Sequence, residues 1–177
     1  MTHAMTLAQT LLACLETALA AGPNPIVADH VMLRAGSQVT PLLGTRDDEC
    51  CRGLGWVRID QVTGVKQLGD RENVSCFSQE RTVILEMGVM RCAPSADVGS
   101  VPTKDQWTAV SLQLDADHGA MEAAICCAFG DLDDDDQVAD QVAEEVAVGP
   151  YQPVGVDGNC IGGTMTVTLQ MTNCCEE

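Results

Sequence analysis

The chain has 177 residues, enough for one domain with a buried core, and 46% of them are hydrophobic, which argues against a disordered protein. Its net charge of −17 is unevenly distributed, because the segment after Lys104 contains fifteen Asp and Glu residues and neither Lys nor Arg. Neutralising phosphates is what gives nucleic-acid-binding proteins their affinity, so residues 105–177 are not expected to grip DNA or RNA.

The N-terminal segment 4–21 is predicted to form a helix, since leucines recur at the spacing of one helical face and a Gly-Pro step then ends the pattern. The first basic residue is Arg34, so the basic region of a secretory signal is missing. The apolar stretch Leu7–Ala21 contains four polar residues and is interpreted as too short and too polar to span a bilayer. We therefore expect a soluble protein that is made in a cytoplasm and does not bind a membrane.

A long irregular loop is predicted at 24–49, where turn-forming and charged residues replace any periodic pattern. Loops of this length inside a compact domain usually contact a partner or carry function, and Arg34 and Arg46 are the candidate contact residues. Two strands are predicted next, at 51–65 and 82–91, because apolar and polar residues alternate there. The second strand has a mixed second face and is expected to be partly covered on both sides.

The clearest helix is predicted at 103–129. Thr103 and Gln106 form the sequence signature of a capping box. His118 lies in the apolar stripe that follows and is interpreted as a packed core or edge histidine; a metal-ligand or base role beside two acidic neighbours is the less favoured alternative. The stripe expected to face the core is Trp107, Val110, Leu114, His118, Met121, Ile125 and Ala128.

An acidic run, Asp131–Asp136, follows this helix. Its first spacing is that of a calcium loop, but the sixth and twelfth positions are Asp136 and Val142 instead of Gly and Glu, so the run is interpreted as a solvated loop. The chain closes with a predicted hairpin at 146–171 around an Asp-Gly-Asn turn. Its second strand alternates apolar and uncharged polar residues, which predicts one buried face and one polar face without charge.

Ten cysteines are present, and no C-x-x-C spacing suggests a zinc site. Three interpretations stay open: small buried hydrophobic residues, which is favoured, disulfides formed late in an oxidising medium, and a metal site, which is least favoured. The missing secretory signal argues against a secreted disulfide framework. The candidate disulfide cysteines are Cys50, Cys51, Cys76, Cys126, Cys127 and Cys160.

No catalytic motif is found: the sequence has no G-x-S-x-G, no phosphate-binding glycine loop and no H-E-x-x-H. Cys92 or Cys126 could formally act as a nucleophile with His118 as its base, but nothing in the local sequence favours this pair. A reactive thiolate also needs a positive environment, which the C-terminal half lacks. We therefore expect no catalytic residue, no metal site and no cofactor, and a protein that is not an enzyme.

Several passages resemble the tail terminator proteins in the neck of long-tailed actinobacterial bacteriophages. They are EMGVMRCAP at 86–94, the Pro102-Thr103 helix start, and GPYQP at 149–153 leading into GNCIGGT at 158–164. The predicted order of helix, long loop, two strands, helix and hairpin is also similar. The resemblance covers most of the chain from Cys50 onward, whereas the first helix agrees in position only.

This resemblance implies an α+β fold, a single domain over residues 1–177 with an antiparallel or mixed sheet flanked by two helices. It implies a homo-oligomer, a hexameric ring that sits on the major tail tube protein, stops tube growth and offers the joining surface to the head–tail connector or stopper protein. Such a protein would belong to the virion after assembly in the host cytoplasm. The family has no catalytic residues to carry over.

In such a ring, six copies would place about −100 charges around a channel through which DNA slides. Acidic walls within a Debye length of about 10 Å would deny the phosphates any counter-charge and so prevent adhesion. The candidate channel-facing residues are Asp131, Asp133, Asp134, Asp135 and Asp136. The alternative that these acids only keep the protein soluble stays equally open.

Two other functions remain as alternatives. One keeps the virion and changes the position of the protein, to a head-to-tail connector or stopper or to a tail tube protein. The other, from a different class, is a cytosolic cysteine-rich thiol or metal-binding protein.

Overall fold

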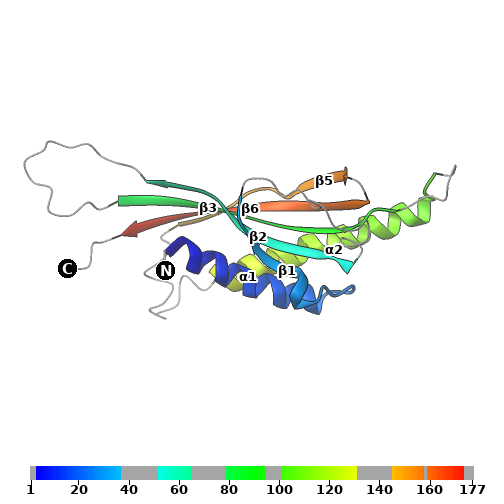
Figure 1. Cartoon of the computed structure of the whole chain (residues 1–177), viewed down its shortest axis with the longest axis horizontal. Coiled ribbons are helices and arrows are strands. Elements are labelled where there is room, and N and C mark those ends of the chain that lie inside the picture. The colour runs from blue at the N-terminus through cyan, green and yellow to red at the C-terminus, as the bar shows by residue number, and fades with distance from the viewer. Residues whose placement is uncertain are drawn as a thin grey trace, which may run out of the picture.

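The computed structural model describes residues 3–36, 52–64, 79–94, 101–130, 145–157 and 159–173. Over these ranges it shows two α-helices, a short 3-10 helix and a six-stranded mixed sheet. Both α-helices lie on the same face of the sheet, which gives two layers (Figure 1). The α+β class with a mixed sheet and two flanking helices, predicted from sequence, is therefore confirmed.

Helix α1 (His3–Ala21) buries one apolar stripe, as its leucine spacing predicts. By length and composition alone Ala4–Ala21 is apolar enough to cross a membrane, so the sequence-based exclusion of a membrane span was too strict. In the structure the stripe packs into the core that the helices form with the sheet. Its buried residues are Leu7, Ala8, Leu11, Leu15 and Leu19.

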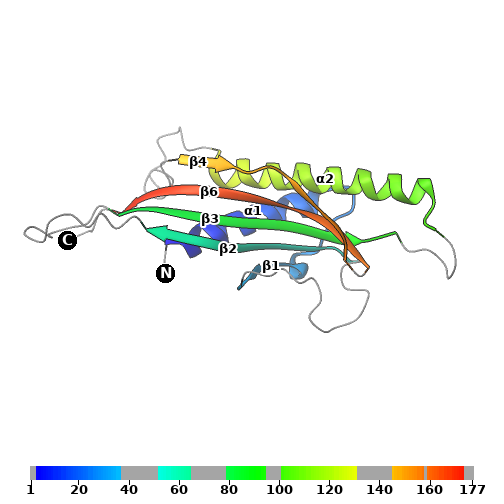
Figure 2. The same ribbon diagram turned by 90° about the horizontal axis from the view of Figure 1, so that it is seen from above.

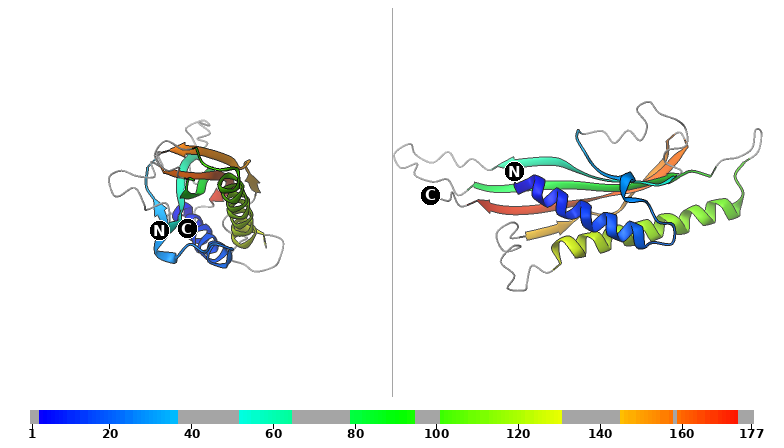
Figure 3. Two further views of the ribbon diagram at one scale, coloured as in Figure 1. Left: turned by 90° about the vertical axis from the view of Figure 1, so that its right-hand side faces the viewer. Right: turned by 60° about the horizontal axis from the view of Figure 1, so that its bottom comes forward.

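Helix α2 (Lys104–Phe129) begins at the predicted capping box. The Thr103 backbone N–H donates to the Gln106 side chain at 2.7 Å, and the Gln106 N–H donates back to the Thr103 hydroxyl at 3.3 Å. These two bonds satisfy donors that a helix start leaves without partners. The helix runs antiparallel to α1, as the side view in Figure 3 shows.

The sheet has the strand order β1-β2-β3-β6-β4, and β5 also pairs with β6. Among the strands that the structure describes, β1 and β2 pair in parallel and the other pairings are antiparallel. In Figure 2 the long strands β2, β3 and β6 lie side by side over α1. The strands are β1 (Val31–Arg34), β2 (Leu54–Gly64), β3 (Gln79–Cys92), β4 (Glu145–Val148), β5 (Gln152–Asp157) and β6 (Cys160–Asn173).

Two predictions about the strands need correction. The segment 24–49, expected to be all loop, contains the 3-10 helix Ala28–His30 and β1. Its residues from 37 onward lie outside the described part. The first arm of the hairpin is also not one strand, because the pairing with β6 is interrupted at Pro150, just after the Gly149 N–H donates to the Thr166 carbonyl at 2.8 Å. Strands β4 and β5 pair with different halves of the same β6 edge. Proline lacks the N–H that a continuous ladder needs.

The main core lies between the sheet and the helices. Every second residue from Val83 to Val89 of β3 and from Met165 to Met171 of β6 faces this core, and the register sets these residues beside one another across the two strands. The alternation predicted for the last strand is thus confirmed. The residues are Val83, Leu85, Met87 and Val89 on β3, and Met165, Val167, Leu169 and Met171 on β6.

A smaller cluster of Trp56, Met90 and Cys160 lies on the opposite face of the sheet. Gly88 pairs with Trp56 in the β2–β3 register, and a Cβ at this glycine would clash with the indole ring. The missing side chain therefore lets the indole lie against β3. We call the sheet face that carries Trp56, opposite to both helices, the open face.

Candidate functional site

Most of the sequence-based site candidates fall outside the described residues. Of the two candidate loop arginines, the structure describes Arg34. It is the last residue of β1, is half-buried and pairs in register with Arg58 of β2. The candidates without a structural description are Asp131, Asp133, Asp134, Asp135, Asp136, Arg46, Cys50, Cys51 and Cys76.

The described acids of the C-terminal half lie mainly along α2. Asp115 and Glu122 are exposed and seven residues apart, so they share one flank of the helix. Asp105 in the first turn and Glu145 at the start of β4 are exposed as well. Asp117 is the exception, since it is only 3% exposed. Asp105, Asp115, Glu122 and Glu145 therefore contribute negative charge to the surface.

The buried Asp117 carboxylate joins α2 to the sheet. The Arg91 side chain at the end of β3 donates to both of its oxygens, from Nε at 2.9 Å and from Nη2 at 2.6 Å. Gln113, one turn earlier on α2, donates a third hydrogen bond at 3.0 Å. Because a buried charge is tolerated only when it is paired and hydrogen-bonded, this arrangement indicates a structural role.

The same network reaches α1. The side-chain amide of Asn24, just after α1, donates to the Gln113 side-chain oxygen. Gln113 thus connects the end of α1 with Asp117 and, through it, with β3. These polar contacts fix the direction in which α2 leaves the body of the protein.

A second polar group stands beside this network. The rings of His118 and Tyr151 stack with centroids 4.6 Å apart and an interplanar angle of 28°. The Tyr151 ring also covers Gly163, where a Cβ would clash with it. His118 faces Glu122 at 3.4 Å and remains partly exposed, which is the edge position expected from the sequence.

The hydroxyl of Tyr151 has a pKa that is displaced from its ordinary value. Burial raises the pKa of its hydroxyl above the ordinary value, and the negative charge of Asp117 raises it further. The buried hydroxyl oxygen has no hydrogen-bond partner among the described residues. An unpaired, hard-to-ionise hydroxyl points to packing as the contribution of this side chain, because a proton-transfer role needs a partner within hydrogen-bond reach.

Arg58 forms the polar centre of the open face. Its guanidinium donates to both carboxylate oxygens of Glu86 at 2.8 Å and to the backbone oxygen of Gly36 at 3.0 Å, and it pairs with Asp60 at 3.0 Å. The hydrogen bonds to Glu86 raise the pKa of Arg58 above its ordinary value, against the opposing effect of burial. The chain after β1 is thereby held to the sheet.

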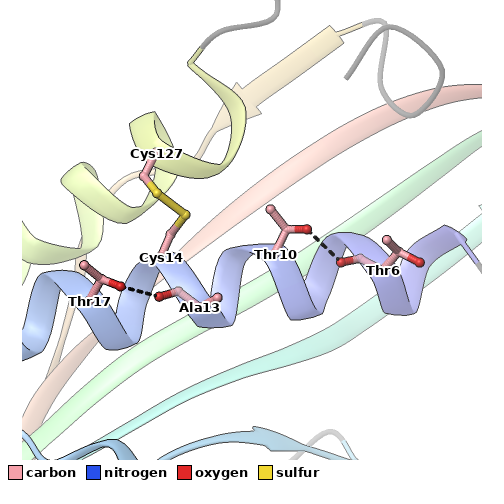
Figure 4. The surroundings of a disulfide bond; sticks show 6 residues. All are labelled: Thr6, Thr10, Ala13, Cys14, Thr17 and Cys127. Atoms are coloured by element: carbon pink, nitrogen blue, oxygen red, sulfur yellow. Dashed lines mark hydrogen bonds between the residues drawn. A yellow bond between two sulfur atoms is a disulfide. The ribbon is translucent and has the colours of Figure 1, made fainter. Parts of the chain in front are cut away.

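More of the described cysteines form disulfides than the sequence analysis favoured. Cys14 of α1 is bonded to Cys127 of α2, with Cα atoms 5.9 Å apart and a sequence separation of 113 (Figure 4). Cys92 and Cys160 are each disulfide-bonded as well, whereas Cys126 is a free, exposed thiol. The favoured interpretation, small buried hydrophobic residues, is therefore wrong for the described cysteines, since four are disulfide-bonded and the fifth, Cys126, is exposed.

Two of the candidate disulfide cysteines that the structure describes, Cys127 and Cys160, are bonded, but Cys126 is not, and Cys14 and Cys92 were missed. Neighbouring residues on a helix point about 100° apart, so only one member of the 126–127 pair can face α1. The sequence gives a weak signal for Cys14, which lies next to the leucine stripe that packs inside.

The described ranges contain no group of three His, Cys, Asp or Glu side chains that could hold a metal ion. No protein-family model matches the chain, and no curated protein matches it.

Proposed function

We propose that this chain is a structural protein of the phage neck, a tail terminator that caps the tail tube as a homo-oligomeric ring and joins the head connector. DNA would pass through the ring without specific binding. In this proposal the protein belongs to the virion and assembles in the host cytoplasm, with the major tail tube protein and the connector or stopper protein as its neighbours.

The observation that carries the proposal is the charge distribution. The first 104 residues hold eleven acids and nine bases, while residues 105–177 hold fifteen acids and no base. Asp105, Asp115, Glu122 and Glu145 from that half are exposed. A ring with this surface around its channel would repel the DNA backbone at short range.

The disulfides support the virion as the place where the protein acts. Cytosolic thiols are kept reduced, whereas disulfides persist in secreted proteins and on virion surfaces. A chain that folds in a host cytoplasm and is then released with the particle would form the Cys14–Cys127 bond late. The bond would then strengthen the contact of two helices that already pack together.

The polar clusters support a structural role over a catalytic one. Arg91 with Asp117 and Arg58 with Glu86 are charge pairs whose members bind each other. The described residues provide no nucleophile held against a base, which a covalent mechanism requires. Their polar side chains therefore act as connections between elements.

The experiment that tests the proposal is electron microscopy of phage particles made without this protein. Overlong tails are expected, because nothing would stop tube growth. Tails of normal length beside unjoined heads would instead show a connector or stopper, and missing tails would show a tube protein. Normal, infectious particles would refute all three virion functions.

A further inference from the structure

The two halves of α2 are attached to the body of the protein differently. The prediction that its whole apolar stripe faces the core is wrong for the first half, because Trp107 is 39% exposed and neither hydrophobic cluster of the described residues includes Trp107, Val110 or Leu114. In the second half, the buried residues are Asp117, Met121, Ala124, Ile125 and Phe129. The packing of α2 against α1 and the sheet therefore depends on its second half.

The C-terminal end of α2 lacks the electrostatic support that its first turn has. Asp105 in the first turn suits the positive end of the helix dipole, whereas the last turn contains no basic residue. In sequence Asp131 follows Gly130, the C-cap residue, and five of the six residues at 131–136 are Asp. Negative charges near the negative end of a helix dipole destabilise that end, and these carboxylates also repel one another. The sequence therefore disfavours the last turn of α2.

The last turn, residues 126–129, has few side chains that anchor it. Phe129 is buried and Ala128 is half-buried, but Cys126 and Cys127 are exposed. The Gly130 backbone N–H donates to the Cys126 carbonyl at 2.8 Å, which closes the turn. The disulfide from Cys127 adds a covalent bond to α1 at this place (Figure 4). This bond is therefore positioned to hold a helix end that the nearby charges disfavour.

A reagent in solution can reach this disulfide in the folded protein. Cys127 is exposed, whereas Cys14 is half-buried and packs against the main core. Both helices also contribute buried side chains to the same core, so their packing does not depend on the bond alone. Exposed disulfides are reduced more easily than buried structural ones. The bond can therefore be opened while the rest of the fold persists.

We propose that the Cys14–Cys127 disulfide is a redox switch for the last turn of α2. In the oxidised protein the bond holds residues 126–129 against α1; in the reduced protein charge repulsion unwinds this turn while the first part of α2 stays folded. Cytosolic thiols are kept reduced, whereas an oxidising medium preserves disulfides. The turn, from which the chain continues toward β4, is thus loose in a cytoplasm and fixed outside it. This inference does not depend on the neck function.

The opening reaction can be written with a dithiol as the reductant. Its thiolate attacks Sγ of Cys127, the bond between the two cysteine sulfurs breaks, and Cys14 leaves as a thiolate that takes up a proton. The second thiol of the reagent then displaces Cys127 from the mixed disulfide, and the Cys127 thiolate is protonated in turn. The protein disulfide has gained two electrons and two protons, and the dithiol has lost them and leaves as a cyclic disulfide.

The first measurement follows reduction of the folded, oxidised chain by dithiothreitol. Alkylation and peptide mass spectrometry read the thiols of Cys14 and Cys127 separately from those of the other cysteines. We expect the rate at which both thiols appear to rise in proportion to the dithiothreitol concentration over about a tenfold range, because the reagent attacks an exposed sulfur directly. A rate that stays constant as the reagent is raised would overturn the proposal, since the bond would then open only after unfolding.

The second measurement is amide hydrogen exchange over seconds to minutes under non-reducing conditions. Cys127→Ser removes the bond, and Cys126→Ser changes the neighbouring exposed thiol of the same turn and serves as the matched control. Mass spectrometry after alkylation confirms that Cys14 is a free thiol wherever Cys127 is replaced. A third chain adds five substitutions to Cys127→Ser, namely Asp131→Asn, Asp133→Asn, Asp134→Asn, Asp135→Asn and Asp136→Asn.

We expect the amides of residues 126–130 to exchange at least about tenfold faster in Cys127→Ser than in wild type, and those of Cys126→Ser to match wild type. The five Asn substitutions should remove most of this increase, because they remove the repulsion at the helix end. The amides of β3 and β6 should stay protected in every chain. Unchanged exchange in Cys127→Ser, an increase that persists undiminished after the Asn substitutions, or opening of β3 and β6 together with the turn would each overturn the proposal.

Discussion

Replacing Asp117 by Asn tests whether the buried ion pair positions α2. The substitution keeps the shape of the side chain and removes its charge, so the Arg91 guanidinium, whose side chain is 12% exposed, loses its counter-charge. Removing one partner of a buried pair costs about 3–5 kcal/mol. We expect about 3 kcal/mol, because the Asn oxygen still accepts a hydrogen bond.

This loss can be measured by urea unfolding under non-reducing conditions, followed by far-UV circular dichroism. With an m-value of about 2 kcal/mol/M, the midpoint should fall by about 1.5 M. In a thermal scan the same loss of stability corresponds to a fall in Tm of about 6–12 °C for a chain of this size.

The matched control is Glu122→Gln, which removes a carboxylate from the same helix. The Glu122 side chain is 60% exposed and lies 3.4 Å from His118, so its loss should cost less than about 0.5 kcal/mol. The double variant with Arg91→Met and Asp117→Leu should be more stable than Asp117→Asn alone, because no unpaired charge remains. An unchanged midpoint for Asp117→Asn, or an equal loss in Glu122→Gln, would refute the reasoning.

Three further predictions concern other parts of the molecule. Cys14→Ser should destabilise the oxidised protein by about 2–4 kcal/mol in thermal unfolding, since the disulfide links residues at a sequence separation of 113, while Cys126→Ser should change little; equal losses would contradict this. Tyr151→Phe should keep or raise stability at neutral pH, because the lost hydroxyl has no partner. Because the pKa of Tyr151 is raised in the folded protein, this hydroxyl ionises at lower pH in the unfolded chain, so the stability of the wild type should fall as the pH rises above 10.0. The fall should be smaller in Tyr151→Phe, and identical alkaline denaturation curves would argue against this account. Thr103→Ala should cost about 1 kcal/mol locally and speed amide hydrogen exchange in the first turns of α2, and unchanged exchange there would show that the cap is dispensable.

The two helices and the long strands could be predicted because their signals are local. The capping box of Thr103 and Gln106 marks the start of α2 within one residue of Lys104, where the helix begins. The alternation of apolar and polar residues along β6 indicates which side is buried, since successive side chains of a strand point to opposite faces. These signals lie within a few residues of each other and do not depend on the rest of the chain.

The candidate site was much less predictable. The stripe on α2 is continuous in sequence, yet Met121 is buried and Trp107 is 39% exposed, because the sheet ends before the helix does. Periodicity reports which residues share a helical face, but it carries no information on how far the neighbouring layer extends. The exposed half of the stripe is therefore a property of the assembled layers.

Composition and local pattern alone thus determined the α+β class, the two helices, the apolar face of β6 and the concentration of acids after Lys104. Only the tertiary structure decided that β1 pairs in parallel with β2, that Cys14 bonds Cys127 at a sequence separation of 113, and that Arg91 meets Asp117. Each of these contacts joins residues that are distant in sequence, and which of many such partners meet depends on the packing of the whole chain.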